Sequence, residues 1–182
     1  MKKLSLIFIV MILVSGLFAA DTDNFDIVVT CSYLDVSLMQ SSDHGTSFDT
    51  WNLGVLAPGA GAEEMTGADH IWVSNGSNTS VDFSAYVDSP APSSCGYGTA
   101  TAWTPSPSAG TDQFHLELGI GTASETPTSY TTITSLSAPG ETYLTDAGAG
   151  IDHELYARFT VPTATSDGCE HTLNVSVMVS VH

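Results

Sequence analysis

The sequence contains almost no basic residues. Lys2, Lys3 and Arg158 are its only lysines and arginines among 182 residues, against 20 aspartates and glutamates. A chain with so few positive charges repels phosphates and anionic lipids, so this composition argues against nucleic-acid binding and against binding to a membrane surface. We therefore expect no nucleic acid among the partners of this protein.

Catalytic and metal-binding motifs are also missing from the sequence. It has no HExxH, GxSxG or CxxC motif and no phosphate-binding loop, and its six histidines are scattered singly. Asp152-His153-Glu154 is the one local acid–base group, but on a strand His153 points to the opposite face from its two neighbours. We therefore expect no enzyme activity, no catalytic residue, no zinc site and no cofactor.

An acidic cluster near the start of the chain is a candidate for calcium binding. Asp21, Asp23, Asn24 and Asp26 supply the oxygen ligands that Ca²⁺ prefers. The cluster lacks the glycine and the distal glutamate of an EF-hand loop. Because an acidic chain forms such clusters by chance, we predict no metal site there.

The first twenty residues have the features of an export signal. Two lysines precede the apolar run "LSLIFIVMILVSGLFAA", which ends in small residues. We predict cleavage after Ala20, with Ala19 as the alternative, and a single domain over residues 21–182. An uncleaved membrane anchor is less favoured, because the run is short for a bilayer span of about 20 residues. The mature protein is then secreted, extracellular or on the cell surface, free of the membrane, with one basic residue and a net charge of about −19.

Beyond residue 20 the apolar pattern has the period of β-strands. Alternating apolar positions occur in residues 71–87, 114–120, 155–161 and 173–181, and clusters of Gly, Pro, Ser, Asn and Asp separate them. We predict an all-β fold: a single antiparallel β-sandwich, immunoglobulin-like or jelly-roll-like Greek key, with seven to nine strands. Residues 51–59 are predicted to form a short strand, and two segments rich in Pro, Gly and Ser, residues 89–110 and 136–151, to form long loops.

The stretch "HIWVSNGSNTSVDFSAYV", residues 70–87, is predicted to form a β-hairpin. Asn75-Gly76 and Asn78 would provide the left-handed backbone conformations of its turn. The core-facing residues would be Ile71, Val73, Val81, Phe83, Ala85 and Val87. Earlier in the chain, the apolar alternation changes phase at Tyr33-Leu34, which indicates a β-bulge or a strand that passes between sheets.

Three cysteines in an exported chain allow one disulfide bond. Cys95 and Cys169 lie in turn-rich segments, whereas Cys31 lies inside a predicted strand. We favour a Cys95–Cys169 bond, with Cys31 as a small buried hydrophobic residue, and pairing of Cys31 with either of the other two is the alternative. Closing a loop of about 70 residues would stabilise the fold by about 2–4 kcal/mol.

Two motifs carry a resemblance to a known group of proteins. "WNLGVLAPG" has the turn pattern aromatic-x-x-G-x-x-x-P-G, and "VSNGSN" has the pattern V-x-N-x-x-N. Their order along nearly the whole mature chain resembles small exported bacterial β-sandwich proteins of immunoglobulin-like type, found at surfaces and in fibres, and more distantly the camelysin-type matrix and pilus subunits. The resemblance implies a sandwich fold and a structural role. It supplies no site residues, since no motif here matches the ligands that a metalloprotease would need.

These observations predict a secreted structural protein that assembles with copies of itself into an extracellular filament, pilus or surface coat by strand exchange. The last predicted strand, "LNVSVMVSV", is long, uncharged and free of proline, so its edge can accept a strand from another chain. The donor would be residues 21–32; pairing of this segment within its own domain is the alternative.

The alternative function is a cell-surface adhesin or carbohydrate-binding module that recognises surface glycans. Trp51, Trp72 and Trp103 would then provide a platform for stacking against sugar rings, with Trp72 the most exposed of the three.

Overall fold

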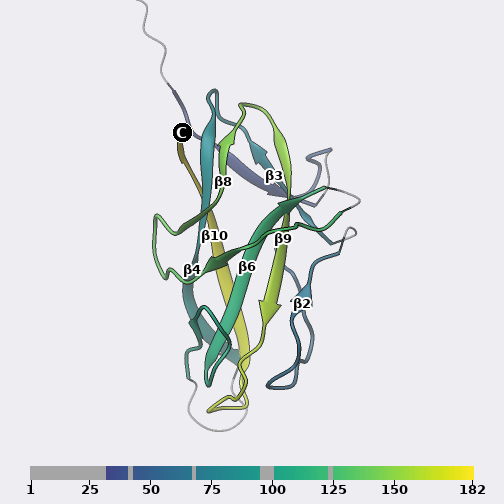
Figure 1. Cartoon of the computed structure of the whole chain (residues 1–182), viewed down its shortest axis with the longest axis vertical. Coiled ribbons are helices and arrows are strands. Elements are labelled where there is room, and N and C mark those ends of the chain that lie inside the picture. The colour runs from purple at the N-terminus through teal and green to yellow at the C-terminus, as the bar shows by residue number, and fades with distance from the viewer. Residues whose placement is uncertain (1–31, 41–42, 67–68, 95–100, 123–124) are drawn as a thin grey trace, which may run out of the picture. The chain divides into compact units, whose positions relative to one another are not determined.

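The computed structural model describes residues 32–40, 43–66, 69–94, 101–122 and 125–182 (Figure 1). Residues 32–182 form a compact unit separate from residues 1–31. The predicted export signal and Cys31 therefore lie outside the described residues, as does the candidate calcium cluster of Asp21, Asp23 and Asp26. Among the residues described, no helix is long and apolar enough to cross a membrane.

The predicted all-β fold is confirmed, with ten strands in two sheets and no helix in the described part of the chain. The strands are β1 (Val36–Met39), β2 (Glu63–Glu64), β3 (Ile71–Asn75), β4 (Val81–Ser94), β5 (Thr104–Pro105), β6 (Gln113–Gly121), β7 (Thr131–Ile133), β8 (Glu141–Ala147), β9 (Asp152–Thr160) and β10 (Glu170–Val181). The predicted number of seven to nine strands is too low. β2 and β5 have only two residues each and are too short to show an alternating pattern.

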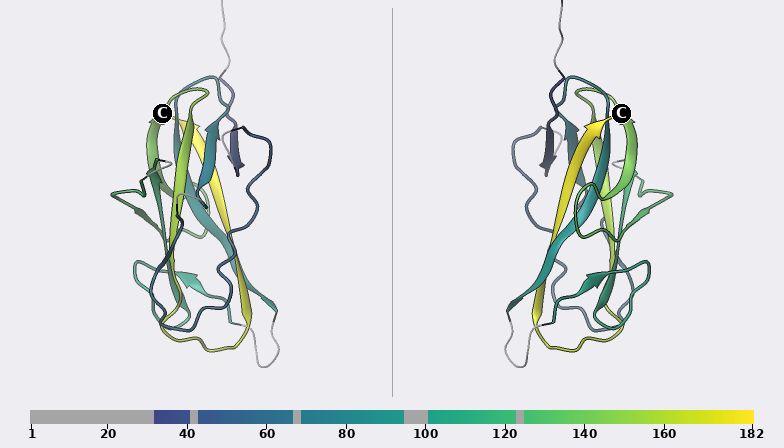
Figure 2. Two further views of the ribbon diagram at one scale, coloured as in Figure 1. Left: turned by 90° about the vertical axis from the view of Figure 1, so that its right-hand side faces the viewer. Right: turned by 90° about the vertical axis from the view of Figure 1, so that its left-hand side faces the viewer.

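The two sheets differ in width. The larger has the strand order β1-β3-β9-β6-β5, with β2 also paired to β9 and β7 to β6. The smaller has only β10-β4-β8, with β4 in the centre. All pairings are antiparallel except that of β5 with β6. Strand β10 follows β4 along nearly its whole length, as the turned views show (Figure 2).

The core lies between the sheets, and the predicted inward faces form it. Ile71 and Val73 of β3 and the alternate residues from Val81 to Val87 of β4 are buried. β6 and β9 contribute Phe114, Leu116, Leu118, Leu155, Ala157 and Phe159. Strand alternation therefore predicted which face of each of these strands packs inside.

Tyr156 is buried although alternation places it on the outer face of β9. Its hydroxyl donates a 2.7 Å hydrogen bond to the carbonyl of Thr122. The segment that follows β6 packs closely over the outer face of this sheet. A Cβ at Gly119 would lie 2.7 Å from the carbonyl oxygen of Ser129 and 2.9 Å from the Pro127 side chain. The outer face of the larger sheet is thus partly covered by its own β6–β7 connection.

The predicted hairpin over residues 70–87 is wrong. β3 belongs to the larger sheet and β4 to the smaller one, so the chain crosses between sheets instead of turning back on itself. None of Asn75, Gly76 and Asn78 has a positive φ. A Cβ at Gly76 would contact the carboxylate of Asp35, an exposed side chain.

Three further predictions about local structure are wrong. Residues 136–151, predicted as a loop, contain β8, and β4 continues to Ser94 through prolines that were expected to end it. A register shift between Thr172 and Asn174 of β10 accommodates that proline-containing stretch. Residues 51–59, predicted as a strand, are irregular.

Candidate functional site

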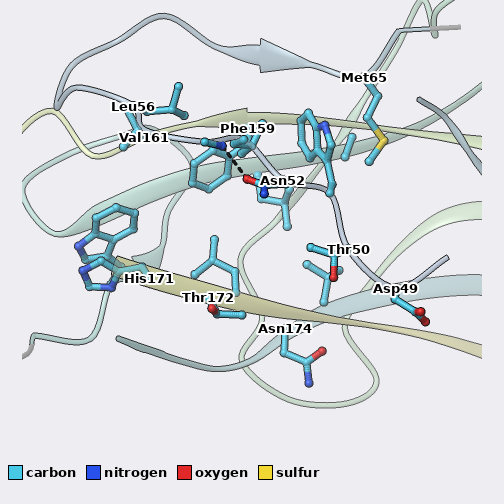
Figure 3. Close-up of a pocket in the computed structure, with 18 of the residues that line it drawn as sticks. Asp49, Thr50, Asn52, Leu56, Met65, Phe159, Val161, His171, Thr172 and Asn174 are labelled. Carbon is cyan, nitrogen blue, oxygen red and sulfur yellow. Dashed lines mark hydrogen bonds between the residues drawn. The ribbon is translucent and has the colours of Figure 1, made fainter. Parts of the chain in front are cut away.

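A groove of about 1090 Å³ opens between the sheets beside β10 (Figure 3). Its three walls are the inward side of β10, the core face of β6 and β9, and the irregular chain from Phe48 to Leu56. The β10 residues on its wall include His171, Leu173, Val175 and Val177, which alternate along the strand, and the sheet opposite contributes Leu116, Leu118, Leu155, Ala157 and Phe159. The groove is therefore a long channel that follows one strand, lined by these apolar residues and by polar ones such as Thr50, Asn52 and Asn174.

The groove exists because the smaller sheet ends at β10. On β4 the inward residues Val81, Phe83, Ala85 and Val87 are all 0% exposed. On β10, which lies beside β4 in the same sheet, the residues of the same face are only half-buried: Leu173, Val175, Val177 and Val179. Within the described residues no strand pairs with the other edge of β10. The core of the sandwich is thus incompletely covered along this edge.

The chain between β1 and β2 covers the groove only loosely. It is held at one end by the Phe48 N–H, which donates to the Leu38 carbonyl at 2.9 Å, and at the other by the Gly59 N–H, which donates to Pro162 at 2.9 Å. Between these points Trp51 is half-buried and lines the groove, whereas Val55 is fully exposed. This segment is irregular chain that pairs with neither sheet, so it adds no strand beside β10 in the part of the chain that the structure describes.

A stacked pair of rings lines the groove at the start of β10. The rings of Trp103 and His171 lie 3.8 Å apart at an angle of 17°. His171 Nε2 lies 3.1 Å from Asp167 Oδ1, and the two side chains are 3% and 1% exposed. The Thr101 N–H hydrogen bond, together with the His171 ring and the Cys169 N–H, holds the pKa of Asp167 below its usual value. The carboxylate is therefore charged at neutral pH.

The predicted disulfide lies near the same end. Glu170 of β10 pairs with Ser94 of β4, so Cys169 directly precedes the paired end of β10, and Cys95 directly follows that of β4. This register supports a bond between the two cysteines. Because Cys95 lies outside the described residues, the Cys95–Cys169 bond stays a prediction.

The three tryptophans do not form one platform. Trp51 and Trp103 line the groove, whereas Trp72 does not and instead lies against the ring of His70 at 5.4 Å. Trp72, predicted to be the most exposed, is half-buried. His70 in turn stacks on Tyr156, so Trp72 belongs to an aromatic group on the outer face of the larger sheet.

The residues Asp152-His153-Glu154 separate as strand alternation predicts. Asp152 Oδ2 lies 2.7 Å from His44 Nε2. The ring of His153 instead packs edge-on against the ring of Phe83 between the sheets, with 6.3 Å between the ring centroids. Burial lowers the pKa of His153, partly offset by the charge of Asp152. In the part of the chain that the structure describes, no three His, Cys, Asp or Glu side chains are grouped to hold a metal ion.

No protein-family model, curated protein or solved structure matches this chain.

Proposed function

We propose that this protein is a secreted structural subunit that assembles into an extracellular filament, pilus or surface coat by strand exchange between copies. The observation that carries the proposal is the contrast between β4 and β10: equivalent inward positions are fully buried on one strand and half-buried on the next. A strand added beside β10 would complete the smaller sheet and cover those positions.

The shape and chemistry of the groove favour an extended peptide as its occupant. An edge strand presents unpaired N–H and C=O groups, which a β-strand satisfies along its whole length. Alternate side chains of that strand would enter the channel beside Leu173, Val175 and Val177. A β-strand would therefore both pair with the main-chain groups at the edge of β10 and place side chains in the groove.

The donor that the sequence offers is residues 21–32 of another copy. Its alternating apolar residues are Phe25, Ile27, Val29 and Cys31. It directly precedes an exposed stretch, residues 32–35, which is tied to the β3–β4 connection. The Tyr33 N–H donates to Asn78 Oδ1 at 3.0 Å, and the Asp35 N–H donates to Ser77 Oγ at 2.8 Å.

Charge makes this assembly sensitive to salt. Each mature copy has a net charge of about −19, so copies repel one another in solution. The proposed contact gains its energy from apolar burial and main-chain hydrogen bonds, which salt does not screen. We expect filaments to form more readily at 0.5 M than at 0.02 M NaCl, because the Debye length falls from about 20 Å to about 4 Å.

Deletion of residues 21–32 from the mature protein tests the proposal. Electron microscopy and size-exclusion chromatography should show filaments for the full mature chain and a folded monomer for the deletion variant. A synthetic peptide of residues 21–32 should bind that monomer and raise its melting temperature.

Point variants in the donor provide matched controls. Ile27→Asp places a charge on the side that would enter the groove and should abolish filaments, whereas Val28→Asp places it on the opposite side and should leave them. Filaments that persist without residues 21–32 would contradict the proposal, as would an unfolded deletion variant, because the segment would then belong to its own domain. A strictly monomeric wild-type protein that is retained on a glycan array would favour the adhesin alternative.

A further inference from the structure

The groove and the proposed donor have the same number of alternating positions. Four inward residues of β10 line the groove: His171, Leu173, Val175 and Val177. The donor has four apolar residues with the same spacing of two: Phe25, Ile27, Val29 and Cys31. Because side chains on one face of a strand repeat every two residues, the two sets can lie opposite each other in only two complete registers, one antiparallel and one parallel.

The first described residue of the chain and the start of β10 lie at opposite ends of the sandwich. The described chain starts beside the β3–β4 connection, where the Tyr33 N–H is bonded to Asn78. β10 ends at this same connection, since Val181 pairs with Val81 and the His182 N–H donates to Ser80. Figure 1 shows the purple start of the described chain and the C-terminus together at one end of the molecule. The groove-lining residues of β10 begin at the other end of that strand.

This inference rests on the proposed function. The positions of the chain start and of the start of β10 then determine the direction in which the donor is inserted. The donor stays attached to its own subunit through residue 32, so its last residue lies at the mouth of the neighbour's groove and its first residues lie deepest. Head-to-tail stacking then brings the donor in from the Glu170 end, and the donor runs opposite to β10.

We propose that the inserted segment pairs antiparallel with β10 of the next copy, with Ile27 opposite Val175 and Val29 opposite Leu173. The ends of the register then place Phe25 opposite Val177 and Cys31 opposite His171.

Side-chain size supports the same register. The ring of Trp103 covers His171 at 3.8 Å, and the His171 side chain is only 3% exposed. A small side chain such as Cys31 would meet less steric resistance beside these stacked rings than an aromatic ring. The parallel register would place the ring of Phe25 there instead.

Paired cysteine substitutions distinguish the two registers. In a Cys31→Ala background, Ile27→Cys is combined with Val175→Cys for the antiparallel register or with Leu173→Cys for the parallel one. Directly opposite residues have Cα atoms about 4.5–5.5 Å apart, which a disulfide spans, whereas positions two residues off lie about 7–8 Å away. Preformed filaments are oxidised and separated on a non-reducing gel.

We expect a ladder of covalent oligomers for Ile27→Cys with Val175→Cys and monomer alone for Ile27→Cys with Leu173→Cys. The reverse pattern, or filaments that give no ladder with either pair, would overturn the register and leave the proposed function standing. A crosslink within single monomers would overturn insertion into a neighbour. Absence of filaments from both the wild-type and the Cys31→Ala protein would instead refute the proposed function itself.

Discussion

Replacement of Asn75 by alanine should destabilise this fold more than any other change in the β3–β4 connection. The Asn75 side chain is fully buried. Its amide Nδ2 donates to the carbonyls of Ala147 and Gly148 at 2.9 Å and of Thr79 at 3.1 Å, and its Oδ1 accepts from the Ser77 N–H at 2.9 Å. One side chain thus joins the crossing between the sheets to the end of β8.

The expected loss follows from the number of these bonds. An amide has two N–H groups, so the three donor contacts count as about two bonds, and the Ser77 contact adds a third. At about 1 kcal/mol for each bond, with an added penalty for buried carbonyls left without a donor, the Asn75→Ala variant should lose about 3–5 kcal/mol. For a domain of this size that lowers the melting temperature by roughly 6–20 °C.

Asn78→Ala is the matched control, because it removes the same side chain from the same connection at an exposed position. Asn78 is exposed and accepts a hydrogen bond from the exposed Tyr33 N–H, so we expect a loss of about 1 kcal/mol or less. Urea unfolding followed by circular dichroism measures both variants. Equal losses for Asn75→Ala and Asn78→Ala would refute the assignment of Asn75 as the link between the sheets.

Three further outcomes are expected. Phe83→Ala should cost about 3–5 kcal/mol, because the ring is 0% exposed between the sheets, and an unchanged melting temperature would reject this core assignment. Non-reducing peptide mapping should recover Cys95 joined to Cys169, whereas a linked peptide containing Cys31 would contradict that pairing. Burial lowers the pKa of His153, so below about pH 6.5 the unfolded chain takes up a proton that the folded chain resists, and stability falls as the pH drops. His153→Phe should weaken this loss between pH 7.5 and 5.5 in urea unfolding, and an unaltered pH dependence would exclude His153 as its source.

Local alternation was enough to predict the strands and most of the core. The positions from Val81 to Val87 and from Leu155 to Val161 alternate every second residue, and this period reports which side of a strand is buried whatever its neighbours are. β8 was missed because Gly, Pro and Ser around it are typical of turns, and its pairing with β4 supplies the stability that its composition does not predict.

Sheet membership could not be predicted in the same way. The motif "VSNGSN" is typical of a tight hairpin, yet the bonds from Asn75 to Ala147 and Gly148, more than 70 residues away, hold a crossing between sheets. Tyr156 is similarly buried by a connection that packs over Gly119 and Gly121. Both outcomes depend on contacts between segments distant in sequence, which no local pattern contains.

For the candidate site too, some features follow from the sequence and others only from the tertiary structure. By itself the sequence determined that residues 173–181 form a long, uncharged strand without proline, and that the chain carries almost no positive charge. Only the tertiary structure decided that this strand is the edge of a three-stranded sheet facing a wider one, with a groove beside it. The physical reason is that alternation sets which side of a strand is apolar, whereas the burial of that side depends on which strands lie next to it.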